Sequence, residues 1–319
     1  MANEVLERLD ASVRRGTFGV ITSIVAAQRG RIVHEAYFEG DANTLRNTRS
    51  ATKTVAGMLV GLAIERGDIS GVDAPLLSFF DDLAPFPHDG PAKRAVTLED
   101  LLTMSSALDC DDADPASPGN EELMDATPDW LRFALDLPMR SEADRGTWRY
   151  CTAGVTALAG VLERATGQPV EEFARQHLFA PMGIDDVTWF RSPTGLVQTG
   201  GGLEMRSRDL LALGQLTLDE GIHGDRRILP ADWVRASLQP HRRIDDVTDY
   251  GYLWWLRTLP LGASTTRAAL MQGNGGNKVA VMPELEAVAV ITSTNFNTPG
   301  MHAWTDAILL DHLFPVLAA

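Results

Sequence analysis

The chain has 319 residues, of which 45% are hydrophobic and 22% charged, and its formal net charge at pH 7 is −15. This composition is typical of an ordered globular protein, and the acidic charge argues against binding to nucleic acid or to an anionic membrane surface. No apolar run approaches the roughly 20 residues of a membrane span, and residues 1–16 lack the apolar core of a signal peptide, so we expect a cytoplasmic protein.

The chain order of the predicted elements is strands, then helices, then strands and a last helix. Residues 18–40 contain two strand-forming runs joined at Arg29-Gly30, which is the pattern of a β-hairpin. Apolar residues then recur at helical spacing, and the expected helices are 50–67, 97–106, 128–137, 152–167, 169–179 and 207–221. The later strands are expected at 250–257, 268–274, 277–283 and 287–293, and a helix begins at about Met301.

This order predicts the α+β class. Successive strands are linked by hairpins, so we expect one antiparallel sheet built from both chain ends and flanked by helices, with an inserted, mostly helical lobe. We interpret 1–319 as a single domain, with an α/β lobe at about 1–65 and 200–319 and a helical lobe at about 66–199. A cleft between the lobes is the natural place for a ligand.

Two features that often mark metal or disulfide sites have weak signals here. Cys110 and Cys151 have no CxxC or histidine-rich context, so we expect reduced, largely inert thiols. The four aspartates within 109–114 have the density of a calcium loop but lack the spacing of an EF-hand, which favours a solvated loop. We therefore expect no metal site.

The segment NTRSATKTVAG, residues 47–57, contains the first candidate for chemistry. Lys53 follows Ser50 by one turn at the head of an apolar helix, so the ammonium nitrogen can reach the serine oxygen. Helix dipole and burial both disfavour the charged lysine, so we expect a lowered pKa and a free amine that acts as the base for Ser50. The alternative is an N-cap serine followed by a lysine that reaches solvent.

Two further stretches strengthen this interpretation. In RYCTAG, Tyr150 precedes a helix whose first turn contains Thr152, and a tyrosine near a lysine can transfer a proton to a leaving group. In LMQGNGGNKVAV, a glycine-rich turn joins two apolar strands, and a backbone N–H of Gly273, Asn274 or Gly275 could pair with that of Ser50 as an oxyanion hole. A phosphate loop is disfavoured because this turn leads into a strand.

Together these stretches resemble the serine β-lactamase and penicillin-binding-protein superfamily, whose signatures include Ser-x-x-Lys. Within it, the chain is most similar to the class C-like branch of esterases, D-aminopeptidases and 6-aminohexanoate-dimer hydrolase. The resemblance extends over nearly the whole chain and includes LEDLLTMSSALD, GGLEMRSRDLLALGQL and YGYLWWL. It implies that Ser50 is the acylated nucleophile, Lys53 its base and Tyr150 the general acid/base, with no cofactor or metal.

The chain departs from the class C pattern at two positions. Thr152, which we expect to bind substrate, stands where class C β-lactamases have asparagine. Met271, followed by Gln272, stands where they have lysine and many esterases have histidine. The resemblance therefore implies that the cation for a β-lactam carboxylate is missing, unless a loop arginine at 191, 242 or 243 supplies it. We expect poor turnover of penicillins and cephalosporins.

The sequence thus predicts a serine acyl hydrolase that acts through an acyl-enzyme on a small ester or amide. Acyl transfer, as in a transacylase or peptide cyclase, is an alternative, and so is a catalytically silent binding domain. The loops at about 107–127 and 191–200 are expected to shape the pocket. Because adjacent strand residues face opposite sides, at most one of Trp254 and Trp255 is expected to face it. The oligomeric state and the natural substrate stay open.

Overall fold

The computed structural model describes residues 2–262 and 264–318, and within them an eight-stranded antiparallel sheet has the strand order β2-β1-β12-β11-β10-β9-β8-β7. The strands are β1 (Ile21–Gln28), β2 (Arg31–Tyr37), β7 (Arg242–Arg243), β8 (Thr248–Tyr250), β9 (Trp255–Leu261), β10 (Ser264–Gly273), β11 (Asn277–Met282) and β12 (Ala287–Ser293). Because β1 pairs with β12, the sheet is built from both chain ends as predicted. Two small two-stranded sheets contain the other strands: β3 (Arg46–Asn47) pairs with the distant β4 (Glu204–Met205), and β5 (Ile222–His223) forms a hairpin with β6 (Arg226–Arg227).

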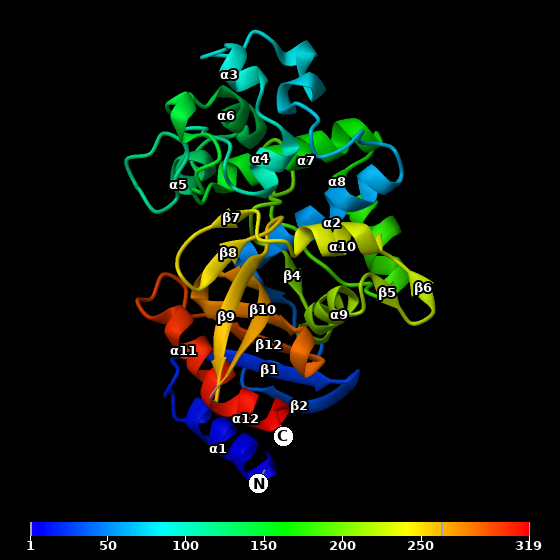
Figure 1. Cartoon of the computed structure of the whole chain (residues 1–319), viewed down its shortest axis with the longest axis vertical. Coiled ribbons are helices and arrows are strands. Elements are labelled where there is room, and N and C mark those ends of the chain that lie inside the picture. Colours follow the sequence, from blue (N-terminus) through cyan, green and yellow to red (C-terminus); the bar gives the residue numbers. More distant parts are fainter. Residues whose placement is uncertain (1, 263, 319) are drawn as a thin grey trace.

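The helices lie on both faces of this sheet and beyond one end of it (Figure 1). They are α1 (Ala2–Arg14), α2 (Thr52–Glu65), α3 (Pro91–Arg94), α4 (Leu98–Leu102), α5 (Glu121–Asp125), α6 (Trp130–Asp136), α7 (Thr152–Thr166), α8 (Val170–Ala174), α9 (Ser207–Leu218), α10 (Ala231–Ser237), α11 (Met301–Ala307) and α12 (Phe314–Leu317). None of the described helices is long and apolar enough to cross a bilayer.

The sheet is buried on both faces. Side chains alternate along a strand, so in β12 Val288 and Val290 join the core shared with α2, α7 and α9, whereas Ala289 and Ile291 join a second core with α1 and α12. This double burial explains why β12 is apolar at successive positions. The sheet therefore forms a rigid support for the turn that joins β10 to β11.

Local sequence signals place most elements correctly. The Arg29-Gly30 hairpin is present between β1 and β2, Thr97 forms the expected N-cap of α4, and Gly167 ends α7 in a left-handed conformation. The strand expected at 250–257 is wrong in one respect, because β8 ends at Tyr250 and β9 begins at Trp255. Between them Gly251 lies so close to Ser237 that an added Cβ would stand 2.0 Å from its carbonyl oxygen.

The expectation of two free thiols is also wrong. Cys110 and Cys151 form a disulfide, with their Cα atoms 5.3 Å apart. Both side chains are buried at the start of α7. A spacing of 41 residues has no local signature, so only the tertiary fold brings the two sulfurs together.

Candidate active site

Ser50 lies in a 3-10 turn, Arg49–Ala51, which leads directly into α2. Arg49 has a φ of 50°, which is a left-handed conformation that a non-glycine residue adopts at a cost of about 1–3 kcal/mol. Such strain persists only where the surrounding structure holds it, and it is often found at functional sites. The residue before the candidate nucleophile is therefore in a special conformation.

This turn is hydrogen-bonded to the segment that leads into β4. The backbone N–H and the hydroxyl of Thr48 both donate to the carbonyl oxygen of Leu203, at 2.9 and 2.7 Å. In return, the N–H of Leu203 donates to Oγ1 of Thr52 at 3.0 Å. Ser50 is thus held between two hydrogen-bonded threonines.

Lys53 makes the contact that its spacing predicts. Its side chain is almost fully buried, and Nζ donates to Oγ of Ser50 at 3.1 Å and to the carbonyl oxygen of Gly200 at 2.6 Å. The predicted lowering of its pKa is wrong. Burial alone lowers the pKa of Lys53, but the adjacent Tyr150 and the carboxylates of Glu121 and Asp112 outweigh burial and raise this pKa above the ordinary lysine value.

Tyr150 lies over the same lysine. The Nζ atom of Lys53 is 4.8 Å from the centroid of the Tyr150 ring, so the ring face meets the amine. Trp148 and Trp255 pack against Tyr150 with ring centroids 6.2 and 5.7 Å away. Trp254 is buried in the core, whereas Trp255 is half-buried and packs against Tyr150.

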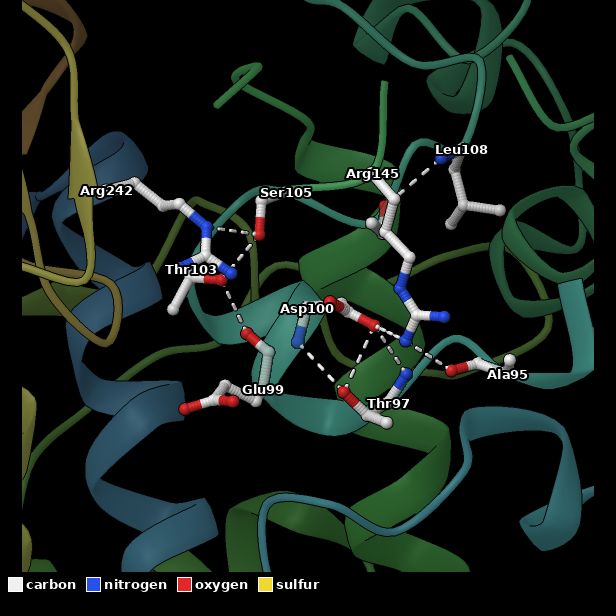
Figure 2. A network of polar contacts seen from close by, with 10 residues as sticks. Ala95, Thr97, Glu99, Asp100, Thr103, Ser105, Leu108, Arg145 and Arg242 are labelled. Carbon is white, nitrogen blue, oxygen red and sulfur yellow. Dashed lines mark hydrogen bonds and ion pairs between the residues drawn. The ribbon is translucent and has the colours of Figure 1, made fainter. Parts of the chain in front are cut away.

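A polar network anchors the segment that leads to Tyr150 (Figure 2). Arg145 donates to Oδ2 of Asp100 at 2.7 Å, and Arg242 reaches from β7 to Oγ of Ser105 at 3.0 Å. Backbone bonds add to this, since Gly146 donates to the carbonyl oxygen of Ser105. The network fixes the chain just before the tyrosine and leaves Arg242 engaged away from Ser50.

The glycine-rich turn lies against the Ser50 turn. A Cβ added at Gly273 would stand 2.1 Å from the carbonyl oxygen of Thr48, so only glycine allows β10 to come this close. Gly275 has a φ of 89°, and its N–H donates to the sulfur of Met301 at 3.0 Å. The side chain of Asn274 is paired with that of Asn297. Gly273 and Asn274 are therefore the remaining candidates for the second oxyanion donor.

Ser50 opens into a cavity of about 280 Å³ that suits a small acyl group. Arg49, Phe190, Gly201 and Asn274 are among the side chains and backbone that line it. Three carboxylates also line it, those of Glu121, Glu122 and Asp125. The loops expected to shape the pocket do so, since these acids come from 107–127 and Gln198 from 191–200.

Sequence reasoning missed the acidic side of this cavity. The only local signal is Asn120, which caps α5 and so places Glu121 and Glu122 in the first turn of that helix. Thr152, which we expected to bind substrate, is fully buried, and its hydroxyl donates to Oε2 of Glu121 at 3.4 Å. The carboxylate of Glu121, rather than the hydroxyl of Thr152, therefore lines the cavity.

The aspartates at 109–114 are not merely a solvated loop. Asp109 and Asp111 pair with Arg140 and Arg149, and Asp112 accepts a hydrogen bond from the N–H of Thr152 at 2.8 Å. These contacts join the loop to the start of α7.

The cation expected to be missing at Met271 is indeed absent there, because the Met271 side chain is fully buried in the core. The loop arginines do not replace it: Arg191 pairs with Glu171, Arg242 with Ser105 and Arg243 with Asp246. The cationic side chain that lines the cavity is Arg49, whose guanidinium stacks 4.0 Å above the ring centroid of Phe296.

Comparison with known proteins identifies relatives by sequence and by fold. The chain is 29% identical over 286 residues to the 6-aminohexanoate-dimer hydrolase of Paenarthrobacter ureafaciens, which covers 82% of this chain and 70% of that protein. It is 30% identical over 152 residues to esterase EstB of Burkholderia gladioli, covering 45% and 38% of the two chains. The structure of simvastatin synthase from Aspergillus terreus superposes with a TM-score of 0.74 at 16% identity, covering 99% of this chain and 96% of the other.

The family model described as Beta-lactamase matches residues 13–313, which is nearly the whole chain. That span contains the Ser50 turn, Lys53, Tyr150 and the glycine-rich turn. The chain therefore belongs to the beta-lactamase family.

Proposed function

We propose that the chain is a serine acyl hydrolase that acts through an acyl-enzyme on a small ester or amide. Its family makes it an enzyme of the serine hydrolase type. The observation that carries the proposal is the contact of 3.1 Å between Nζ of Lys53 and Oγ of Ser50, at the edge of a cavity large enough for an acyl group. A silent binding domain would have no need of this buried amine.

The raised pKa of Lys53 favours one division of the proton transfers. An ammonium group cannot accept the proton of Ser50, so in this mechanism the base is Tyr150 in its phenolate form, and the Lys53 ammonium stabilises that negative charge. The oxygen of Ser50 then attacks the carbonyl carbon of the substrate. Tyr150 returns the proton to the departing alcohol or amine.

The oxyanion of the tetrahedral intermediate would be bound by two backbone N–H groups. One is that of Ser50, and the other is that of Gly273 or Asn274, which the close approach of β10 brings to the Ser50 turn. Water, activated by Tyr150, then attacks the acyl-enzyme, and Ser50 leaves as the free acid forms. No cofactor or metal takes part in these steps.

The cavity favours neutral or cationic acyl groups. Glu121, Glu122 and Asp125 line it against one guanidinium, that of Arg49, so a substrate carboxylate meets net repulsion. The two curated relatives compared above are named as a hydrolase of an aminohexanoate dimer and as an esterase, which agrees with amides and esters as the substrate class. Penicillins and cephalosporins, which carry a carboxylate, are expected to be poor substrates.

Intact-mass analysis after treatment with a fluorophosphonate tests the proposal. We expect a single covalent adduct on the wild-type chain, none on Ser50→Ala, and hydrolysis of a p-nitrophenyl butyrate by the wild type alone. Circular dichroism of both proteins must agree, so that the loss reflects the missing hydroxyl. A folded Ser50→Ala variant with wild-type turnover would remove Ser50 from the mechanism. Addition of an amine or alcohol acceptor separates hydrolysis from acyl transfer, because a transacylase would form the acceptor's ester or amide in preference to the free acid.

A further inference from the structure

We propose that the Cys110–Cys151 disulfide and Asp112 act together as a clasp that positions Tyr150 and Glu121, so that full activity requires both cysteines to be oxidised. The inference rests on the proposed function for its kinetic readout. The disulfide would thereby be part of the machinery that aligns the site, in addition to any contribution to overall stability.

The disulfide joins two segments at the points where each carries a residue of the site. Cys151 stands between Tyr150 and Thr152, and Cys110 lies two residues before Asp112. The approach is tight, because a Cβ added at Gly119 would lie 2.6 Å from Cβ of Cys110. The bond thus fixes the acidic loop directly beside the backbone of Tyr150.

Asp112 provides the second half of the clasp through three hydrogen bonds. Its N–H donates to the carbonyl oxygen of Tyr150 at 2.9 Å, and its Oδ2 accepts from the N–H of Thr152 at 2.8 Å. Its Oδ1 accepts from the N–H of Glu121 at 2.9 Å. The backbone of Asp112 therefore holds Tyr150, and its side chain joins Thr152 to Glu121, the residue that brings a carboxylate into the cavity.

The loop between Cys110 and Glu121 is closed by hydrogen bonds between its own residues. Gly119 donates to the carbonyl oxygen of Asp109 at 3.0 Å, and Nδ2 of Asn120 donates to the carbonyl oxygens of Asp112 and Asp114 at 3.3 and 3.2 Å. The Glu121 carboxylate, in turn, accepts from the Thr152 hydroxyl. If the disulfide were reduced, Cys110 would no longer be held beside Cys151. The start of this loop could then move, and the orientation of the Glu121 side chain would no longer be fixed.

Small movements of these groups matter for the chemistry. A displacement of about 1 Å in a positioned group can slow catalysis on the order of a hundredfold. Tyr150 lies over the lysine that contacts Ser50, and Glu121 helps to keep that lysine charged. A disulfide that served stability alone would change the unfolding temperature and leave the kinetics of the folded protein unchanged. Disulfides are usually reduced in the cytoplasm and persist in oxidising compartments. The inference therefore predicts higher activity in an oxidising compartment than in a reducing one.

The first experiment compares oxidised and reduced wild-type protein at a temperature where circular dichroism shows both to be folded. A water-soluble phosphine cleaves the S–S bond; phosphorus takes up the oxygen of one water molecule, and each sulfur gains a proton. Thiol titration verifies two free cysteines. We expect kcat for the butyrate ester to fall on the order of tenfold or more in the reduced protein. The Cys110→Ala/Cys151→Ala variant should show the same fall without reductant.

The second experiment leaves the disulfide intact and breaks the other half of the clasp. Asp112→Asn keeps the shape of the side chain but turns one acceptor into a donor, which faces the N–H of Thr152 or Glu121. We expect lower kcat and faster hydrogen exchange at those two amides. Asp114→Asn is the matched control, because Asp114 lies on the same loop, is exposed and caps only Ala116 through its side chain. Reduction of Asp112→Asn should add little further loss, because both changes release the same segment.

Wild-type kinetics and unchanged amide exchange in folded, fully reduced protein would overturn the inference, and so would a silent Asp112→Asn variant. If reduction unfolds the chain, the disulfide-intact Asp112→Asn variant decides alone. The exchange measurement also separates this inference from the proposed function. A wild-type protein that never reacts with fluorophosphonate refutes the hydrolase, whereas protected amides at Thr152 and Glu121 that become exposed on reduction would still establish the clasp.

Discussion

The cavity beside Ser50 should discriminate among acyl groups by their charge. We consider three p-nitrophenyl esters of matched length, with ω-aminohexanoyl, heptanoyl and pimeloyl groups, which end in an ammonium, a methyl and a carboxylate. The three acyl chains fill similar volumes, so burial of their methylene groups contributes almost equally. The differences in kcat/KM then report the electrostatics of the cavity.

The magnitude follows from the side chains that line the cavity. Three carboxylates line the cavity together with the Arg49 guanidinium, and the Lys53 ammonium beside Ser50 balances Glu121, so about one negative charge is uncompensated. Glu122 and Asp125 are exposed, so each unit interaction at about 4–5 Å is worth about 1 kcal/mol, near the value in water. Since about 1.4 kcal/mol corresponds to a tenfold change in rate, one uncompensated charge worth about 1 kcal/mol should make the cationic ester faster than the neutral one by roughly fivefold. The anionic ester should be slower than the neutral one by a similar factor.

The pH dependence identifies the group responsible. Although Asp125 as a whole residue is exposed, partial burial of its carboxyl group, together with the neighbouring Glu121 and Asp112, raises the pKa of Asp125 to about 6. As the pH falls through this value, Asp125 takes up a proton and the cavity loses a negative charge. The preference for the cationic ester should therefore weaken below pH 6 in the wild type, and Asp125→Asn should show this weaker preference above pH 6 as well.

The assay is kcat/KM for the three esters between pH 5 and 8, at low and high salt, in wild type, Asp125→Asn and the control Asp114→Asn. Salt should reduce the differences, because the charges are partly exposed. Faster turnover of the pimeloyl ester than of the ω-aminohexanoyl ester would refute the reasoning. It would mean that Arg49, rather than the carboxylates, governs the acyl site.

Two other predictions follow from the same geometry. Gly273→Ala places a Cβ 2.1 Å from the carbonyl oxygen of Thr48, so the Ser50 turn must shift and kcat should fall on the order of a hundredfold. The control Gly90→Ala, whose Cβ meets nothing within 4 Å, should leave kcat unchanged. An unchanged kcat in Gly273→Ala would contradict the close approach of β10 to the Ser50 turn. Because the pKa of Lys53 is raised above 10.5, kcat/KM for a neutral ester should show no loss from lysine deprotonation until the pH exceeds about 10. A decline between pH 7 and 9 that disappears in Lys53→Arg, with the fold intact by circular dichroism, would show instead that the ammonium is lost near neutral pH.

The sequence was sufficient where local signals decide the structure. The Arg29-Gly30 turn, the Thr97 cap and the helix that begins after Ser50 depend on residues within a few positions of each other, and the structure contains all three. The contact between Lys53 and Ser50 is of the same kind, because three-residue spacing at a helix start fixes it.

The sequence was insufficient where distant segments meet. The Cys110–Cys151 disulfide and the orientation of Glu121 depend on how the loop after α4 folds onto the start of α7. The pKa of Lys53 shows the consequence most clearly. Helix position and burial can be inferred from local sequence, and both disfavour the charged lysine, but Tyr150, Glu121 and Asp112 together reverse the direction and come from other parts of the chain.

This reversal changes the division of roles at the site. If Lys53 were neutral, a base would lie beside Ser50 and the acidic loop would matter only for substrate binding. In the proposed mechanism a charged Lys53 requires Tyr150 to carry the proton, and the buried ammonium requires nearby negative groups to stabilise it. Glu121 is such a carboxylate, and it also lines the cavity that receives the acyl group. The loop that carries Asp112 and Glu121 therefore couples substrate charge to the protonation state of Lys53, so substitution of Glu121 should alter selectivity and the alkaline limb of the pH profile together.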